Sequence, residues 1–270
     1  MSGLEIVLLS ATGFFAGIFG TMIGIGGGVI FVPVFLLFFD FTPQEAIGTS
    51  LAVVFLNALS GSISYLRQKR VDIKSGWKFA VATLPGAFLG AWLVDYFTPY
   101  ILEMVFGFLL IAVALFIFLR REPDYWDKGK GKNTRKIIDY RGEVFEYTPR
   151  EGLGITISFF VGIISSLLGI GGGILHVPAL IYLLGFPVHI ATATSHFVLA
   201  ISTFSGSITH LTLGNILFLP AIVVGVSAIV GAQIGALLSR RVKGLLIARL
   251  LAIALLLVGV RLLLKALGVF

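Results

Sequence analysis

Residues 24–33 read GIGGGVIFVP and residues 169–178 read GIGGGILHVP, and each stretch lies within a long apolar segment. We call each GIGGG segment a glycine knot. The offset of 145 positions between the knots continues without a gap through Phe41 and Phe186, Ala46 and Ala191, Thr49-Ser50 and Thr194-Ser195, Ser60-Gly61-Ser62 and Ser205-Gly206-Ser207, and Gly86-Ala87 and Gly231-Ala232. Such an offset indicates an internal duplication. We therefore expect two homologous repeats, residues 1–121 and 151–270, joined by a polar linker at 122–150.

The amino-acid composition indicates whether the chain is surrounded by water or by lipid. Hydrophobic residues make up 57% of it and charged residues 12%, and its mean hydropathy is +1.03. Too few charges are present for the surface of a water-soluble domain. Because the apolar runs are continuous rather than alternating, and because lipid admits only helices and closed barrels, the sequence predicts an all-α polytopic membrane protein.

Each repeat contains one broken apolar segment followed by three segments of full span length. A helix needs about 20 apolar residues to cross a bilayer. The segment Leu4–Phe39 is interrupted at Gly24–Gly28, and Gly152–Gly185 has the same plan, so we predict a broken, re-entrant helix hairpin in each repeat. The predicted transmembrane helices are Gln44–Leu66, Trp77–Tyr96 and Ile101–Leu119 in the first repeat, and Val188–Leu211, Leu217–Leu238 and Leu245–Leu267 in the second.

Two local signals support these predicted spans. Pro43 and Glu45 are residues that favour the first turn of a helix. Gly86 and Gly90 form a small-xxx-small pattern, which lets two helix backbones approach closely. We therefore expect a helix start near Pro43 and tight helix packing along the following span.

The distribution of lysine and arginine predicts how the repeats are oriented. Positive residues near span ends favour the cytoplasmic side. They gather around Lys69 in the first repeat, but around Arg241, one span later, in the second. Inverted repeats with three full crossings each would produce this shift, and they would place Lys69, Arg241 and the linker in the cytoplasm. The alternative is eight full spans with parallel repeats.

Three features of the sequence together resemble one known family. These are the doubled GIGGG(x)4P motif, the A(x)2TS stretch that follows it, and the PGA(x)2GA or GA(x)2GA patch one span later. They are similar to the TauE/SafE sulfite exporter family, also called the toluene sulfonate uptake permease family. The resemblance covers nearly the whole chain apart from the linker. It implies a multi-pass secondary transporter of a bacterial or archaeal inner (plasma) membrane, exporting small organic or sulfur-containing anions such as sulfite or sulfonates.

The glycine knots are the first candidates for the substrate site. Inside a membrane, non-helical backbone is stable only where it is buried in protein or lines a wet cavity. Where a helix resumes after such a break, its free N–H groups and the positive end of its dipole favour an anion. We predict an anion site formed by the backbone of Gly26, Gly27, Gly28, Gly171, Gly172 and Gly173. The alternative is that these glycines serve only close helix packing.

Paired hydroxyls follow both knots. Thr49 and Ser50 in the first repeat correspond to Thr194 and Ser195 in the second. Four hydroxyls are therefore expected around one centre near the membrane midplane. The alternative is that each hydroxyl bonds the backbone of its own helix.

Amides and histidines complete the candidate site. Asn57 and Gln233 are buried amides that must find partners, and His196 stands where the first repeat has Leu51. His176 and His196 are the candidates for proton coupling, because they are the mid-span groups able to titrate near neutral pH. An interhelical hydrogen bond is the alternative for each of these residues. The spans carry no mid-span carboxylate, which favours an anion over a cation.

Two functions of different classes remain open. One is a carrier that works by alternating access around a midplane site, and the other is a non-transporting membrane scaffold or assembly factor. A carrier needs a polar midplane pocket touched by both knots, whereas a scaffold would fill that place with side chains. The sequence has no HExxH, GxSxG or paired-carboxylate motif, so no enzyme activity, metal or cofactor is expected. The expected partners are a small anion and the lipid bilayer, without nucleic acid, and homo-oligomerisation is left open.

Overall fold

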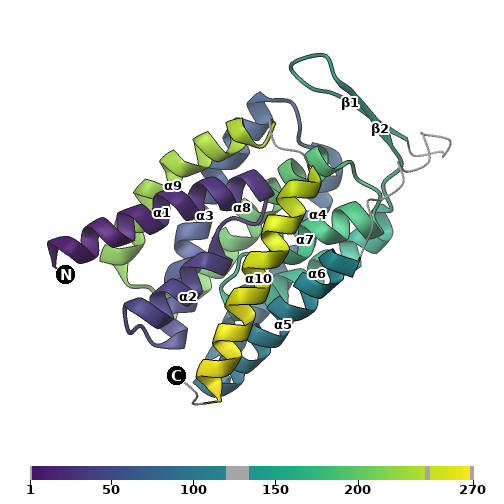
Figure 1. Ribbon diagram of the computed structural model, residues 1–270. Coiled ribbons are helices and arrows are strands. Elements are labelled where there is room, and N and C mark those ends of the chain that lie inside the picture. Colours follow the sequence, from purple (N-terminus) through teal and green to yellow (C-terminus); the bar gives the residue numbers. More distant parts are fainter. Residues whose placement is uncertain (1, 120–133, 241–243, 268–270) are drawn as a thin grey trace.

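The computed structural model describes residues 2–119, 134–240 and 244–267, and long helices make up most of it (Figure 1). The predicted first repeat contains α1 (Gly3–Ile23), α2 (Gly28–Phe38), α3 (Pro43–Arg67), α4 (Ile73–Leu93) and α5 (Pro99–Leu119). The second contains α6 (Glu151–Leu168), α7 (Gly173–Pro178), α8 (Val188–Thr212), α9 (Phe218–Leu238) and α10 (Gly244–Ala266). Among the described residues, five helices are long and apolar enough to cross a membrane, namely α1, α3, α4, α6 and α9. The predicted polytopic helical protein is thus confirmed.

Polar side-chain caps fix where α3 and α4 start. Thr42 and Glu45 form a capping box at the start of α3, in which the Glu45 N–H donates to Thr42 Oγ1 at 3.3 Å and the Thr42 N–H donates to Glu45 Oε2 at 2.9 Å. The prediction from Pro43 and Glu45 is confirmed. The next helix starts at Ile73 rather than at the predicted Trp77, because the Asp72 side chain caps it and accepts the Ser75 N–H at 3.1 Å.

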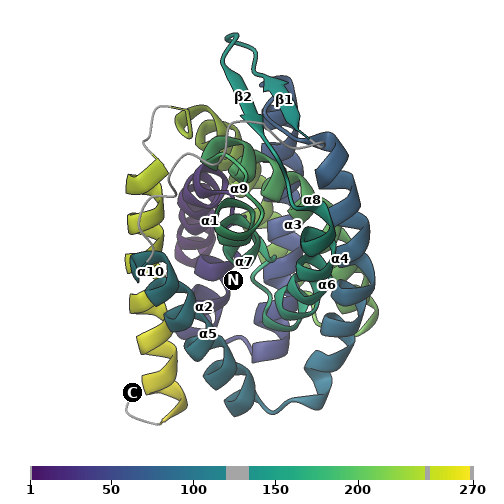
Figure 2. The same cartoon turned by 90° about the vertical axis from the view of Figure 1, so that its right-hand side faces the viewer.

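Small residues bring α1 against α9 and α6 against α4. Gly17 lies on Ala228, where an added Cβ would be 2.8 Å from the Ala228 carbonyl oxygen, and Gly235 lies on Ile18. On the other side of the molecule, Gly86 lies on the backbone of Phe159 and Gly90 on that of Ile163. The predicted close packing along Gly86–Gly90 is confirmed, and Figure 2 shows α4 and α6 side by side.

The two long central helices, α3 and α8, run antiparallel. Gly61 near the end of α3 lies on His196 near the start of α8, and Leu51 near the start of α3 lies on Gly206 towards the end of α8. The outer helices α5 and α10 are antiparallel as well, since Gly107 contacts Leu263 and Ile111 contacts Gly259. Each of these four helices therefore packs against its counterpart from the other repeat.

Each broken segment returns to the end of the molecule from which it starts. In the second repeat, the N–H of Arg150 before α6 donates to the carbonyl of Leu184 after α7 at 3.2 Å. The returning arm is short, because α7 continues only as a π-helical turn over Ala179–Leu183. The outgoing arms are long, as the apolar runs before the knots indicate: α1 has 21 residues and α6 has 18. The hairpins are therefore asymmetric, with one long arm and one half-length arm.

The described part of the linker forms a β-hairpin, which the sequence pattern does not predict. Strands β1 (Arg135–Ile138) and β2 (Val144–Tyr147) are antiparallel, with Arg135 opposite Tyr147. The hairpin projects from one end of the helix assembly (Figure 2). Residues 122–133 of the predicted linker lie outside the described residues.

The outer surface of the helices is apolar. Large side chains such as Phe15, Phe88, Phe108 and Val226 are exposed on α1, α4, α5 and α9. Trp92, Tyr96 and Tyr100 are exposed around the turn between α4 and α5. Aromatic side chains with a polar group are enriched where a protein meets the membrane interface. A belt of this kind fits a helix assembly whose outer face contacts lipid.

Candidate functional site

The two glycine knots meet in the interior, backbone against backbone. A Cβ added to Gly28 would lie 2.7 Å from the Ile170 carbonyl oxygen, and one added to Gly173 would lie 2.5 Å from that of Gly24. Gly26 and Gly171 both face Val54 of α3 and Leu199 of α8. The central residues of the two knots therefore face the same two side chains, which lie midway along the two central helices.

The glycines also supply a backbone shape that other residues rarely adopt. Gly27 and Gly172 have φ angles of 86° and 81°, and both directly precede the half-length helices α2 and α7. This left-handed conformation strains any residue with a Cβ. The predicted glycine residues thus form the turns between long and short arms, and they allow the two knots to touch.

The serines that follow the knots hold them together reciprocally. Ser50 Oγ on α3 donates to the carbonyl of Gly169 at 2.8 Å, and Ser195 Oγ on α8 donates to the carbonyl of Gly24 at 3.2 Å. A carbonyl freed by a break in a buried helix needs such a partner. Each serine therefore satisfies the start of the knot of the other repeat.

The threonines next to these serines bond the starts of other helices. Thr49 Oγ1 accepts the N–H of Leu217 at the start of α9, and Thr194 Oγ1 accepts the N–H of Asp72 at the start of α4, both at 3.0 Å. The structure thus does not bring the four hydroxyls to one centre. The serines contact the knots, and the threonines cap neighbouring helices.

A polar cluster lies beside the first knot. Asn57 Nδ2 donates to the carbonyl of Gly26 at 3.0 Å, and Thr21 Oγ1 donates to Asn57 Oδ1 at 3.3 Å. His196 Nε2 lies 3.3 Å from Thr21 Oγ1, and the Tyr65 hydroxyl donates to the Thr21 carbonyl at 2.7 Å. All four side chains are buried. His196 is packed tightly here, because a Cβ added to Gly61 would lie 2.5 Å from its Nε2.

A small polar cavity lies beside the second knot. Its empty volume is about 180 Å³, and it has room for about one water molecule. His176 reaches it from α7, and its Nε2 lies 3.1 Å from Ser158 Oγ of α6. The residues that line the cavity are Thr83, Val161, Gly171, Gly172, Gly173, His176, Ser195, Val198, Leu199 and Ser202. The cavity therefore touches the second knot and Ser195, but none of its lining residues belongs to the first knot, so it is not the pocket touched by both knots that was expected of a carrier.

Gln233 lies apart from the cavity. Its Nε2 donates to the carbonyl of Ser60 at 2.7 Å and to Ser60 Oγ at 2.8 Å. The amide thus ties α9 to α3, which is the interhelical bond that the sequence left open as the alternative.

Sequence reasoning missed several polar residues of the interior. Thr21 and Tyr65 join the first cluster, while Thr83 and Ser158 belong to the second. None of these belongs to a repeated motif. A position-by-position comparison of the repeats would have found Thr83 and Ser158, because their counterparts are Ala228 and Gly13.

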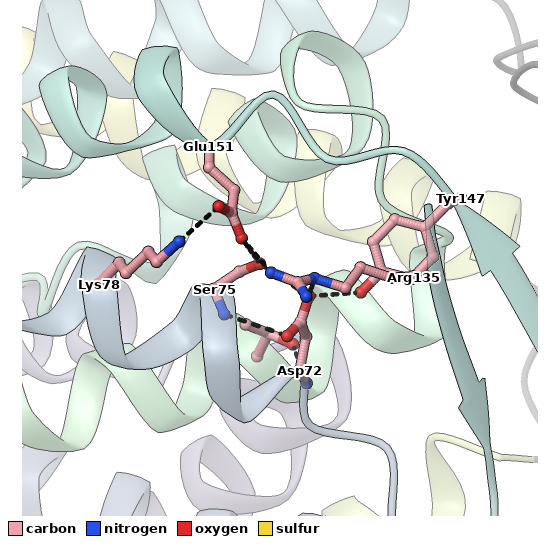
Figure 3. A network of polar contacts seen from close by, with 7 residues as sticks. Asp72, Ser75, Lys78, Arg135, Tyr147 and Glu151 are labelled. Carbon is pink, nitrogen blue, oxygen red and sulfur yellow. Dashed lines mark hydrogen bonds and ion pairs between the residues drawn. The ribbon is translucent and has the colours of Figure 1, made fainter. Parts of the chain in front are cut away.

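A charged network joins the linker hairpin to the helix ends (Figure 3). Tyr147 of β2 donates to Asp72 Oδ2 at 2.8 Å, and Ser75 Oγ donates to the same oxygen at 2.8 Å. Glu151 at the start of α6 pairs with Arg135 of β1 and with Lys78 of α4. Burial, followed by the Asp72 carboxylate, raises the pKa of Tyr147, so its phenol stays a donor. The Asp72 backbone N–H is also the donor to Thr194, which links this network to α8.

These features define a class of protein. Broken helices that meet in the interior, with uncharged polar groups around them, are typical of membrane transporters. The family comparison makes this specific. The family model described as Sulfite exporter TauE/SafE matches residues 9–262, and the chain belongs to that family. It is therefore a multi-pass membrane transporter protein.

Curated relatives agree with this class. The chain is 36% identical to "Probable membrane transporter protein YunE" of Bacillus subtilis over 99% of its own length and 100% of the relative. It is 30% identical to a "Probable membrane transporter protein" of Methanocaldococcus jannaschii over 77% of its length and 73% of the relative. No solved structure matches the chain.

Proposed function

We propose that this protein is a secondary transporter that exports small organic or sulfur-containing anions, such as sulfite or sulfonates, across the inner (plasma) membrane. The observation that carries the proposal is the buried cavity beside the second knot, which is lined by His176, Ser195 and Ser202 and by glycine backbone. No carboxylate is among its lining residues. Hydroxyl, imidazole and backbone N–H groups are donors that suit an oxyanion, whereas a buried cation calls for negative or carbonyl partners.

The two repeats are inverted with respect to each other. Reciprocal contacts support this, since Ser50 bonds Gly169 while its counterpart Ser195 bonds Gly24. The antiparallel packing of α3 on α8, and of α5 on α10, also fits a two-fold axis perpendicular to the helices. Parallel repeats would bring these counterparts together in the same direction. Because each broken segment returns to its own side, three full crossings remain in each repeat, as inversion requires.

Positive residues support a cytoplasmic location for the end that carries the hairpin. Arg70 Nη1 lies 3.4 Å from Ser239 Oγ at the end of α9, and the Arg240 guanidinium lies 5.0 Å from the centre of the Tyr140 ring. The basic loop after α3 and the basic end of α9 are thus at one end of the molecule. Arg241 and Lys243 lie outside the described residues. The positive-inside tendency places this end, with the linker, in the cytoplasm.

Alternating access would occur between two halves that each contain helices from both repeats. One half is α1, α3 and α9, and the other is α6, α8 and α4, as the packing of α1 on α9 and of α6 on α4 indicates. They meet along α3 and α8, where the knots lie. Rocking of the halves would open the cavity first to one side and then to the other. His196 crosses this boundary through its contact with Thr21, and it stays a candidate for substrate handling and proton coupling beside His176.

Flux measurements in proteoliposomes test this function. Purified protein is reconstituted, and uptake of sulfite, a panel of sulfonates and a panel of carboxylates is compared with that of protein-free vesicles. We expect saturable uptake of sulfite or of at least one sulfonate, together with counterflow when the same anion is inside. A folded, reconstituted protein that moves none of these anions would overturn the proposal and favour the membrane scaffold instead.

A further inference from the structure

We propose that the anion binds on one side of the pseudo-symmetric centre only, in the second-knot cavity, and that it travels together with a proton carried by His176 Nδ1. This inference rests on the proposed transport function, and it names the coupling ion and the residues that hold the anion. It also adds Thr83, Ser158 and Ser165 to the site.

Several polar residues at the second knot have no polar counterpart at the first knot. Thr83 and His176, which line the cavity, correspond to Ala228 and Phe31 at the positions 145 residues away. Ser158, which contacts His176, and Ser165, which lies beside Gly172, correspond to Gly13 and Gly20. Phe31 is fully buried, and a Cβ added to Gly27 would lie 2.9 Å from its ring. An aromatic ring therefore lies against the first knot, where the second knot has a cavity.

Two polar atoms at the second knot have no hydrogen-bond partner within the protein. They are Ser165 Oγ and His176 Nδ1, both of which are buried. Ser165 Oγ lies beside Gly172, since a Cβ added there would be 3.1 Å from it. Buried polar atoms are almost always bonded, and each exception calls for a ligand, a water or a mechanism. In the described state the cavity has room for about one water molecule, and a small oxyanion that enters once movement of the halves has widened it would accept from such groups.

The hydrogen bonds fix which nitrogen of His176 carries the proton. Ser158 Oγ donates its single hydrogen to the Gly154 carbonyl at 2.6 Å. Its oxygen can then only accept, so His176 Nε2, 3.1 Å away, is the donor. In the neutral ring Nδ1 therefore has a lone pair and no hydrogen. That atom repels an anion until a second proton binds to it.

Proton and anion consequently stabilise each other in this site. Among the residues that the structure describes, the groups that pack around the His176 ring are uncharged: Ser158 of α6, Phe79 and Thr83 of α4, and Ser195 and Ser202 of α8. A lone imidazolium there would be a buried, unpaired charge, which is costly. An oxyanion in the cavity neutralises it and accepts its Nδ1–H. By reciprocity, a proton that strengthens anion binding is itself bound more tightly when the anion is present.

The transport step then balances in charge and atoms. A water-derived proton from the side to which the cavity is open forms the Nδ1–H bond as the anion enters. After the halves rock, the anion leaves and the Nδ1–H bond breaks, so the proton passes to water on the other side. One proton accompanies one negative charge.

His196 does not offer the same chemistry. Its Nε2 faces Thr21 Oγ1, whose hydrogen is donated to Asn57, so Nε2 is the donor there too. It is, however, packed against Gly61 and does not line the cavity. The open volume beside the second knot is what distinguishes His176.

The test uses proteoliposomes that contain the pH-sensitive dye pyranine, with sulfite and ethanesulfonate as the probes. Ethanesulfonate keeps its charge across the pH range, so any pH dependence of its uptake comes from the protein. In the wild type, uptake of a probe should acidify the interior and should be stimulated by an inward proton gradient. His176→Phe, which copies Phe31, should lose uptake, and His176→Gln should lose the acid stimulation. Ser165→Gly and Thr83→Ala, which copy Gly20 and Ala228, should raise KM.

Controls separate this inference from folding and from transport itself. His210→Tyr copies the counterpart Tyr65 and should keep uptake and acidification unchanged. Wild-type uptake and acidification in both His176 variants would overturn the inference while transport stands, as would wild-type uptake without proton movement. Absence of flux of both probes in the wild type would overturn the inference, and absence of flux of the whole anion panel as well would overturn the proposed function with it.

Discussion

At the scale of single residues, Gly27 and Gly172 are two positions of the site at which the backbone conformation requires glycine. Both have left-handed φ angles, and a Cβ at Gly172 would lie 3.0 Å from Val161. A residue with a side chain costs about 1–2 kcal/mol in this conformation. Gly172→Ala should therefore lower the melting temperature of the purified protein. Gly152→Ala is the matched control, because an added Cβ there meets no atom within 4 Å. Equal melting temperatures for the two variants would show that the left-handed turn is not strained by a side chain.

The reciprocal serines are the second test at this scale. Ser50→Ala or Ser195→Ala removes the donor to the carbonyl that begins a knot. An unpaired buried carbonyl costs about 1–3 kcal/mol. Each variant should lose stability in thermal unfolding, whereas Ser227→Ala should change little because Ser227 only bonds its own helix at Val223. Stability loss as small as that of Ser227→Ala would mean that the knots do not depend on these bonds.

At the scale of elements, the bounds of most helices follow from the sequence. The six predicted spans correspond to α3, α4, α5, α8, α9 and α10, because long apolar runs and caps such as Thr42 and Glu45 are local signals. The hairpin of the linker could not be predicted, since its strands have four residues each and depend on docking. Tyr147 and Arg135 are held by Asp72 and Glu151, which are distant in the sequence.

The docking of the hairpin gives a prediction for Asp72. Asp72→Ala removes the cap of α4, worth about 0.5–2 kcal/mol, together with the acceptor of the Tyr147 hydroxyl. Hydrogen exchange should become faster over residues 135–147 and in the first turn of α4. The control is Lys136→Ala, which removes an exposed ion pair with Glu146, a contact of small energetic value. Unchanged exchange in the Asp72 variant would contradict the docking described above.

At the scale of the whole molecule, the inverted arrangement predicts which residues share a side of the membrane. The chain has no cysteine, so single cysteines can be introduced and labelled in cells. Lys69→Cys and Arg240→Cys should react from the cytoplasmic side, and Gly3→Cys from the opposite side. Labelling of position 240 from the side opposite to position 69 would support parallel repeats with eight spans.

The repeated sequence motifs made the glycines and serines of the candidate site predictable. Repeated residues such as Gly26, Gly171, Ser50 and Ser195 do meet at the centre. The doubled hydroxyls suggest a single shared centre, but the threonines turn to neighbouring helix starts. Residues outside the repeated motifs could not be placed, because polar contacts such as that of Ser158 with His176 depend on the way α6 and α7 fold back. The repeat pattern therefore predicts the glycines and serines at the centre better than it predicts the other polar side chains of the site.

The most direct test of transport at the glycine knots is the initial rate of sulfite uptake into proteoliposomes. The wild-type protein is compared with Gly27→Leu and Gly172→Leu, after insertion of each variant has been verified by membrane extraction and by an unchanged elution profile. Saturable uptake is expected for the wild type and none for either variant, because a leucine at these left-handed positions would strain the turn of each knot and would clash with Phe31 or with Val161 and Ser165. Normal sulfite flux in both inserted variants would contradict a transport path at the knots.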